Sequence, residues 1–229
     1  METNSIIKSK IKKLKLLIVI FNFKLQKREI PAFRGAICEK VGLENVLFHN
    51  HMDSKFIYRY PQIQYKVLNQ NPCIMCMNHG TEEILKLFQR PDIDININGK
   101  QFDLEIKEIL IDKFECEILD DLQEYRIFNW FALNEKNFKK YINSNDYDRT
   151  NLLQKILIGN ILSFAKGINW TVSDQIDVRI LQLPNHRSFS FKDQKMIGFN
   201  INFLANVSLP NYIGLGKSVS RGFGMIQRI

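Results

Sequence analysis

The sequence predicts an α+β fold of two tandem ferredoxin-like (RRM-like) units, each in the order βαββαβ, with a C-terminal glycine-rich loop. Strand-like apolar and β-branched runs alternate with helix signals in the first half, and the second half repeats this pattern less regularly. No linker rich in Pro, Gly or Ser separates the halves. We therefore expect two closely packed domains, residues 1–120 and residues 121–229.

Composition limits the classes of partner. The 229 residues carry a net charge of +8 and are 45% hydrophobic, enough for one large core or two small ones. Positive charge favours a polyanion or an acidic membrane surface as partner. The apolar run Leu16–Phe21 is too short for a signal peptide or a membrane span. Four cysteines without a secretion signal are typical of reduced thiols. We expect a cytoplasmic protein with no membrane partner.

Boundary signals define the elements of the first half. Pro31 stands in the first turn of a helix that Gly42 ends, and Thr81 precedes an acidic first turn of a helix that Pro91 stops. The expected order is a strand at 16–25, a helix at 31–40, strands at 45–51 and at 62–77 with a bend at Pro72, a helix at 82–89, and strands at 92–98 and across 102–119.

The second half contains the longest expected helix, residues 151–166, in which apolar residues recur near helical spacing. Strands are expected at 125–133, 175–183, 195–207 and 223–229. In this scheme a glycine-rich loop stands where the second helix of the repeated unit belongs.

That loop reads GLGKSVSRGFG, residues 214–224. Its GKS is the tail of a phosphate-binding loop, but that motif requires a glycine where Asn211 stands, and no helix follows. Glycines permit positive φ and offer N–H groups to anions, while lysine, arginine and serine add charged and neutral donors. This chemistry suits a sugar-phosphate backbone. The residues concerned are Gly214, Gly216, Lys217, Ser218, Ser220, Arg221, Gly222 and Gly224.

The stretch LFHNHM contains His49 and His51. On a strand, side chains two residues apart share a face, so the two imidazoles would form a general acid and base pair. Two alternatives stay open. H-N-H-M-D resembles the H-x-H-x-D of metallo-β-lactamase-type hydrolases, although Ser54 stands where a histidine ligand is needed. The second alternative is that both histidines are ordinary surface residues.

Two further stretches are less specific. Cys73, Cys76 and His79 have the spacing of zinc ligands, but their apolar neighbours favour buried free thiols. In FIYRYPQIQYK, Tyr58 and Tyr60 interleave with basic residues, a pattern of single-stranded RNA binding that core strands also produce.

GLGKSVSRGFG resembles the C-terminal glycine motif of the repeat-associated RNA-binding (RAMP) superfamily of CRISPR systems. With FRGAI, LFHNH and RYPQIQYK, the chain resembles the CRISPR pre-crRNA-processing endoribonucleases of that superfamily. The resemblance implies cleavage of repeat RNA without a metal or other cofactor, in which the ribose 2′-OH attacks and leaves a 2′,3′-cyclic phosphate and a 5′-OH.

The resemblance also implies roles for residues. His49 and His51 would be base and acid, Tyr58 would position the ribose or phosphate, and Lys40 or Lys66 would stabilise the phosphorane. Arg34, Arg59 and the loop residues would bind RNA, with Lys217 and Arg221 holding its backbone between the domains. Implied partners are repeat RNA and other CRISPR effector subunits, around a monomer or homodimer. The alternative function is a non-catalytic RNA-binding subunit, which needs no histidine pair.

Overall fold

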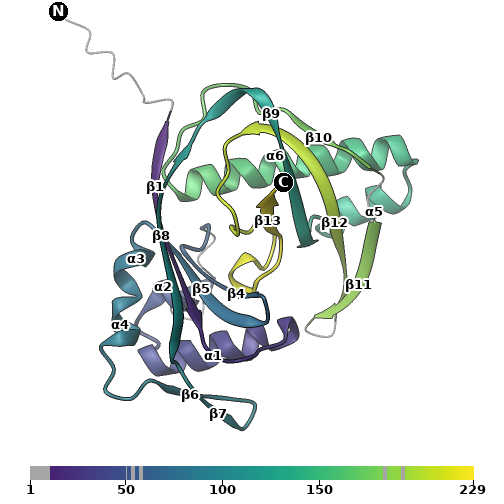
Figure 1. Ribbon diagram of the computed structural model, residues 1–229. Helices are drawn as coiled ribbons and strands as arrows, with labels where there is room; N and C mark the ends of the chain where they lie inside the picture. The colour runs from purple at the N-terminus through teal and green to yellow at the C-terminus, as the bar shows by residue number, and fades with distance from the viewer. Residues whose placement is uncertain (1–10, 50, 53–54, 57–58, 183–184, 192–193) are drawn as a thin grey trace, which may run out of the picture.

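The computed structural model describes residues 11–49, 51–52, 55–56, 59–182, 185–191 and 194–229. It has two lobes, each built around one antiparallel sheet (Figure 1). Within these residues, no helix is long and apolar enough to cross a membrane.

The N-terminal sheet has the strand order β4-β5-β1-β8. In chain order this is second, third, first and fourth, the arrangement that a ferredoxin-like unit gives. The elements of this half are β1 (Lys12–Phe21), η1 (Lys27–Glu29), α1 (Ile30–Val41), α2 (Val46–His49), β2 (His51–Met52), β3 (Lys55–Phe56), β4 (Ile63–Leu68), β5 (Asn71–Met77), α3 (Gly80–Glu83), α4 (Leu85–Phe88), β6 (Asp94–Ile97), β7 (Lys100–Asp103) and β8 (Ile106–Cys116).

Helix α1 agrees with its sequence signals. Pro31 lies in its first turn, and Gly42 ends it at φ 97°, a conformation that favours glycine. Its apolar side covers one face of the sheet, where Val19 and Phe21 of β1 are buried. This helix was predicted correctly.

Two predictions for the first half are wrong. Residues 45–51 do not form one strand: the buried Asn45 side chain donates to the Val41 carbonyl at 2.7 Å, and the chain turns directly into the short helix α2. Residues 62–77 are a hairpin instead of one bent strand. Asn69 and Gln70 both have positive φ (48° and 65°), as a tight two-residue turn requires.

The C-terminal sheet has the order β10-β12-β9-β13, again second, third, first and fourth, with β11 added beside β12. Asn145 caps the long helix earlier than expected, and Asn134 caps a shorter helix that was not predicted. The elements are β9 (Ile118–Trp130), α5 (Glu135–Ile142), α6 (Asp146–Gly167), β10 (Val178–Ile180), β11 (Asn185–Phe191), β12 (Gln194–Val207), η2 (Val219–Arg221) and β13 (Met225–Arg228).

The two lobes share a core. One cluster of buried side chains joins Leu16 and Met75 of the N-terminal sheet to Phe164, Phe203 and Ile226 of the C-terminal half. The N-terminal sheet is therefore covered by its own helices on one face and by the C-terminal half on the other. The expected close packing of the two halves is confirmed.

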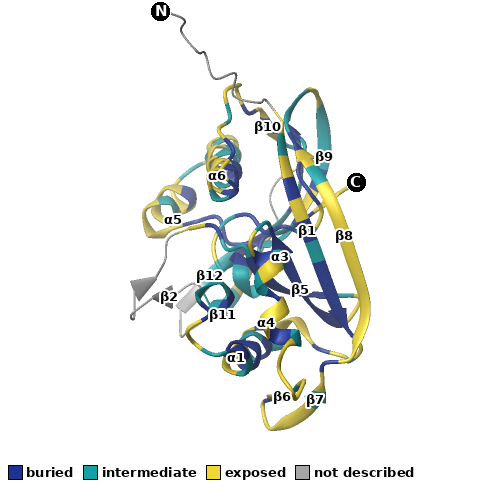
Figure 2. Ribbon diagram, turned by 90° about the vertical axis from the view of Figure 1, so that its left-hand side faces the viewer, coloured by how far each residue is buried: buried dark blue, intermediate teal, exposed yellow. Residues whose placement is uncertain are grey.

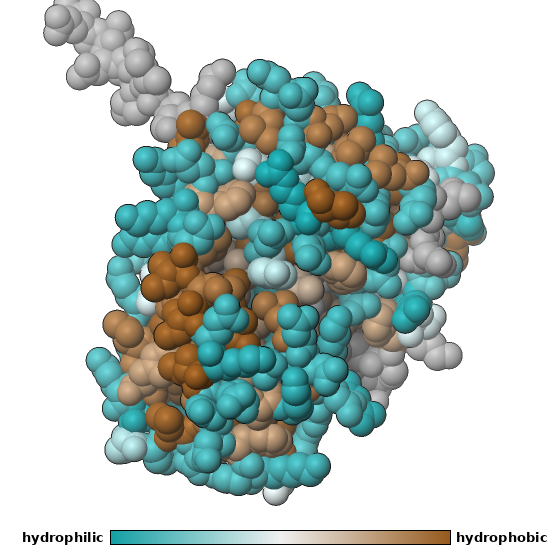
Figure 3. All heavy atoms as spheres, viewed as in Figure 1, coloured by the Kyte–Doolittle hydropathy of each residue, from teal (hydrophilic) through white to brown (hydrophobic). Residues whose placement is uncertain are grey.

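Strand β8 forms the outer edge of the N-terminal sheet, pairing with β1 alone among the described strands. Figure 2 shows it exposed beside a mostly buried β1. Ile106, Ile109, Leu110 and Ile111 are exposed there, and an apolar patch lies over this part of the surface in Figure 3.

Candidate functional site

The glycine-rich loop runs between β12 and β13 and folds back on itself. Gly216, Gly222 and Gly224 have φ of 97°, 83° and 65°, which confirms the expected positive φ at these positions. A Cβ at Gly224 would lie 1.9 Å from the Leu215 carbonyl oxygen, and one at Gly216 would lie 2.7 Å from Trp130 Nε1. These glycines are required because backbone and ring approach so closely.

Most glycine amides of the loop serve the protein itself. Gly214 N–H donates to Gln64 Oε1 (3.1 Å), Gly222 N–H to the Val219 carbonyl (3.1 Å) and Gly224 N–H to the Asn129 carbonyl (3.2 Å). The interpretation that these three amides are presented to an anion is therefore wrong.

The loop is anchored to the N-terminal half through Gly214. Tyr60 Oη donates to the Gly214 carbonyl at 2.7 Å while Gln64 of β4 accepts from its N–H. Tyr60 is buried against Phe164, 5.2 Å between ring centroids, so it is an interdomain core residue and not a surface for bases. Burial raises the pKa of its phenol, which stays neutral and able to donate.

The end of the loop lies against the helix that carries Arg34, and Arg34 contacts the backbone of His49. Arg221 lies in η2, which packs against β4 and α1. Burial, and after it the positive charge of Arg34 in the contacting helix α1, lower the pKa of Arg221. Arg34 also donates to the His49 carbonyl, and its buried Nε has no hydrogen-bond partner. Two cations on contacting elements, one of them with an unused donor, favour an anion beside them.

The histidine pair is arranged differently from the expectation. His49 ends helix α2, and His51 begins β2, where it pairs with Phe56. The alternation argument for one shared face therefore fails. His49 Nε2 lies 2.7 Å from the Leu43 carbonyl, so Nε2 carries the proton of that bond. The side chain of His51 and all of Tyr58 lie outside the described residues.

Neither candidate lysine presents an unpaired ammonium group to solvent: Lys40 is paired with aspartates and Lys66 is buried. Lys40 Nζ contacts Asp92 at 2.7 Å and Asp94 at 3.3 Å, and the bond to Asp92 raises the pKa of Lys40. Lys66 is buried on the side of β4 that faces the C-terminal half. Its Nζ has no partner, and desolvation lowers its pKa to about 8. Any catalytic role of either lysine stays a prediction.

The remaining candidates separate into surface and core. Arg59 is exposed, and Lys217 Nζ donates to the Leu133 carbonyl at 2.9 Å. Cys73 and Cys76 are buried on opposite faces of β5, in different core clusters, so they cannot share a metal. Their burial confirms the expectation of free core thiols, and desolvation raises the pKa of both.

Comparison with known proteins identifies relatives along the whole chain. Family models of the Cas6b N-terminal domain and the Cas6b C-terminal domain match residues 12–115 and 117–229. A crystal structure of Cas6b is 31% identical with a TM-score of 0.86, covering 95% of this chain and 100% of that one. A crystal structure of the CRISPR RNA processing endoribonuclease Cas6b is 28% identical with a TM-score of 0.73, at the same coverage.

A further relative matches more than half of the chain. The uncharacterized protein MJ0978 of Methanocaldococcus jannaschii is 33% identical over 137 residues, which are 59% of this chain and 92% of that protein. The α+β two-domain architecture is thus that of Cas6 proteins. This contradicts the metallo-β-lactamase-type alternative raised by H-N-H-M-D.

Proposed function

The chain belongs to the Cas6b family, and we propose that it is an endoribonuclease that cuts the repeat RNA of CRISPR transcripts into guide RNAs. One solved relative is described as a CRISPR RNA processing endoribonuclease. The net charge of +8 supports an RNA substrate.

One structural observation carries the proposal. Arg34 lies in α1, which packs against the η2 turn that carries Arg221, and it donates to the backbone carbonyl of His49 while its buried Nε has no hydrogen-bond partner. A phosphodiester seated there would receive charge-assisted hydrogen bonds beside the chain segment that carries His49 and His51. Cationic donors, a titratable group and a polyanionic substrate are the parts that phosphodiester cleavage without a metal requires.

The proposed reaction is transesterification. One of His49 and His51 removes the proton of the ribose 2′-OH, and the 2′ oxygen attacks the adjacent phosphorus. The other donates a proton to the departing 5′ oxygen. The P–O bond to that oxygen breaks as the 2′ bond forms, which leaves a 2′,3′-cyclic phosphate and a 5′-OH. Each proton transfer contributes roughly 10²–10⁴-fold to the rate.

The other predicted residues have supporting roles in this proposal. Tyr58 positions the ribose or phosphate. Lys40 and Lys66 stay candidates for stabilising the charged phosphorane, although Lys40 is paired with aspartates and Lys66 is buried. RNA is held by Arg59 and by the loop side chains of Lys217, Ser218 and Ser220.

The division of the chain near residue 120 and the cytoplasmic location stay predictions. The division is supported by the change of sheet: β8 ends at Cys116 and β9 begins at Ile118.

The test uses a labelled CRISPR repeat RNA in excess EDTA, with His49→Ala and His51→Ala variants and an RNA carrying 2′-deoxy at the cut. His79→Ala, an exposed histidine at the start of α3, is the matched control. We expect one cut that survives EDTA, ends in a cyclic phosphate, and disappears with the deoxy RNA or with either variant.

Each other outcome has a defined meaning. Tight binding with no cut would contradict the enzyme and support a non-catalytic RNA-binding subunit that works with other effector subunits. Cutting that stops only in EDTA would contradict the metal-independent mechanism. Full activity in both histidine variants would mean that residues other than His49 and His51 act as acid and base.

A further inference from the structure

The short helix that ends at His49 depends on side chains from other elements for its hydrogen bonds. Helix α2 has four residues, and the last carbonyl groups of an α-helix have no donor within the helix. A buried carbonyl without a donor costs free energy, so its partner must come from elsewhere in the protein. Side chains of α1 and β4 supply the donors here.

The Phe48 carbonyl, immediately before His49, accepts two buried hydrogen bonds. The Tyr65 hydroxyl of β4 donates to it at 3.3 Å, and the Cys38 thiol of α1 donates to it at 3.4 Å. The Tyr65 ring is fully buried and packs edge-on against Phe33, with 5.8 Å between the ring centroids. The hydroxyl of Tyr65 is therefore fixed against the backbone that leads into His49.

The next carbonyl, that of His49, is held from the same side of α1. It accepts from Arg34, which lies one helical turn before Cys38 and so on the same face of the helix. Burial raises the pKa of the Tyr65 phenol well above its usual value and also raises the pKa of the Cys38 thiol. Both groups keep their protons at neutral pH, so the two successive carbonyls retain their donors.

Strand β4 also holds the glycine-rich loop. Gln64, the residue before Tyr65, accepts from the Gly214 N–H at 3.1 Å, and the Tyr65 carbonyl oxygen lies 3.1 Å from the position of a Cβ at Gly222. Neighbouring side chains of a strand point to opposite faces, so Gln64 reaches the C-terminal half while Tyr65 reaches the histidine segment. Two consecutive residues of β4 therefore set the separation of the loop from His49.

We propose that Tyr65 is a positioning residue for RNA cleavage, which holds His49 at a fixed place relative to the glycine-rich loop. This inference rests on the proposed function for the role of His49. The Tyr65 hydroxyl is buried against the Phe48 carbonyl, so it acts through the backbone and not by touching RNA. Displacement of a catalytic group by about 1 Å lowers a rate about 10²-fold. Loss of this hydroxyl should therefore slow cleavage without weakening RNA binding.

The first experiment compares Tyr65→Phe with Tyr125→Phe. Both substitutions remove a buried hydroxyl that donates to a backbone carbonyl, that of Phe48 in the first case and that of Val207, at 2.8 Å, in the second. The Tyr125 hydroxyl also accepts from the Leu209 N–H, so this control should lose at least as much stability. Cleavage of labelled repeat RNA is followed with enzyme in excess, at a temperature where every variant is folded. Kd is measured on the same RNA with 2′-deoxy at the cut.

We expect Tyr65→Phe to lower the single-turnover cleavage rate about tenfold and to leave Kd unchanged. Tyr125→Phe should keep the wild-type rate and Kd despite its lower unfolding temperature. Cys38→Ala should lower the rate less than Tyr65→Phe, because a thiol is a weak donor. A lower rate at constant Kd distinguishes positioning from a general loss of structure, which would affect both quantities.

A second measurement follows the His49 ring without RNA. The chain has four histidines, and the ring resonances of His49 in an NMR spectrum are identified by their absence in His49→Ala. Tyr65→Phe should shift these resonances and Tyr125→Phe should leave them in place. Because phenylalanine keeps the aromatic ring, a shift reports movement of the histidine segment.

A wild-type cleavage rate in Tyr65→Phe would overturn the inference, as would a raised Kd or an equal loss of rate in Tyr125→Phe. Unmoved His49 resonances in Tyr65→Phe would also contradict it. Failure of the proposed function has a separate signature: the wild-type protein would leave the repeat RNA intact, while the resonances still report whether Tyr65 holds His49.

Discussion

In the proposed site, the glycine-rich loop and the histidine segment both lie beside Arg34, but the protein holds them in different ways. The loop is locked by buried bonds from Gly214 to Tyr60 and Gln64 and by close contacts at each glycine. The histidine segment consists of a four-residue helix and a two-residue strand that pairs with another of two residues. The loop proposed to bind RNA is anchored in the interdomain core, whereas the proposed acid and base lie on a short segment with little regular structure.

This difference predicts two separable kinds of mutational effect. Changes of the loop glycines should alter the free energy of unfolding and RNA binding together, since their contacts are also domain contacts. Changes of the histidines should alter mainly the cleavage rate, since the hydrogen bond of the His49 ring to the Leu43 carbonyl is exposed. Measuring stability and activity on the same variants therefore tests the comparison.

The largest expected effect is at Gly224. In Gly224→Ala the new Cβ meets the Leu215 carbonyl oxygen at 1.9 Å, and φ 65° strains any side chain. We expect a loss of about 3 kcal/mol or more in unfolding free energy, measured by urea denaturation.

Gly159→Ala is the matched control for Gly224→Ala. Gly159 lies in the middle of α6 with nothing within 4 Å of the added Cβ. Alanine there should stabilise by about 0.5–1 kcal/mol. Equal effects of the two substitutions would mean that the loop is not held as tightly as described.

Lys66 tests the same interface from β4, where it lies on the same face as Gln64. Its pKa falls from 10.5 to about 8 through desolvation. Burying the unpaired ammonium therefore costs stability on the order of 3 kcal/mol below pH 8. We expect Lys66→Met to unfold at higher denaturant concentration than wild type at pH 7.

The pH dependence of Lys66→Met gives a second readout. Between pH 8 and 10.5 the unfolded chain holds the Lys66 proton that the folded chain has lost, so wild-type stability rises with pH. The advantage of the variant should shrink across this window. A variant that is more stable but no longer cleaves RNA would assign Lys66 a catalytic role at the expense of stability.

A smaller effect is expected at Tyr60. Tyr60→Phe removes the 2.7 Å bond to the Gly214 carbonyl and leaves that oxygen buried without its donor. The cost should be about 1–2 kcal/mol, measured by thermal unfolding.

A double variant with Gln64→Leu extends the Tyr60 test. Both side chains bind the same residue, so their effects should be less than additive once the loop is released. Full additivity would argue against one shared anchor at Gly214.

Much of the fold was predictable because local signals and tertiary packing agree. Pro31 and Gly42 fix the ends of α1, and the uninterrupted apolar run Leu16–Phe21 matches the half of β1 that is buried on both faces. The stretch 45–51 was mispredicted because its helix follows a local hydrogen bond, from the Asn45 side chain to the Val41 carbonyl, that the pattern of apolar residues does not reveal. A polar residue that caps the preceding helix leaves no periodic pattern.

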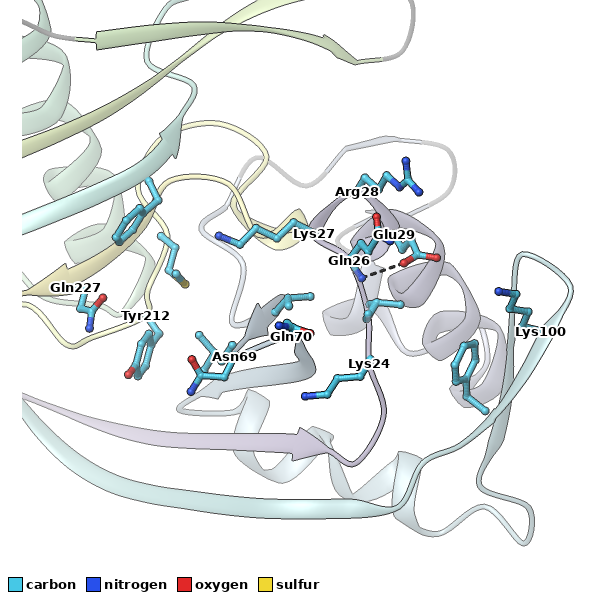
Figure 4. A pocket seen from close by; sticks show the side chains of 16 residues that line it. Lys24, Gln26, Lys27, Arg28, Glu29, Asn69, Gln70, Lys100, Tyr212 and Gln227 are labelled. Carbon is cyan, nitrogen blue, oxygen red and sulfur yellow. Dashed lines mark hydrogen bonds between the residues drawn. The ribbon is translucent and has the colours of Figure 1, made fainter.

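The site was predictable only in part. The loop glycines, His49, Arg34 and Arg221 were named from the family resemblance. The structure places Arg34 against the backbone of His49 and in the helix that contacts the turn carrying Arg221. Tyr60 and Gln64 were not recognised as anchors because their partner, Gly214, is 150 or more residues away in the chain. The cavity of about 840 Å³ that Lys24 and Tyr212 help to line (Figure 4) was missed for the same reason. Its lining comes from segments of both domains, which no local pattern connects.

The smallest expected effect separates charge from packing within the loop. Lys217 Nζ donates to the Leu133 carbonyl, and burial lowers the pKa of this lysine. Lys217→Gln keeps a donor for that carbonyl but removes the positive charge. We expect unchanged unfolding and a Kd for repeat RNA raised about threefold, with a salt slope lower by about 0.7.

Lys139→Gln on the exposed helix α5 is the control for this charge effect. If both lysine variants weaken RNA binding equally, the contribution of Lys217 is part of a general positive field rather than a contact in the loop. If only Lys217→Gln changes the salt slope, one phosphate lies against this side of the loop. Charge and structure would then be separable even inside the more rigid half of the site, because the glycines fix the backbone and the lysine acts through its side chain.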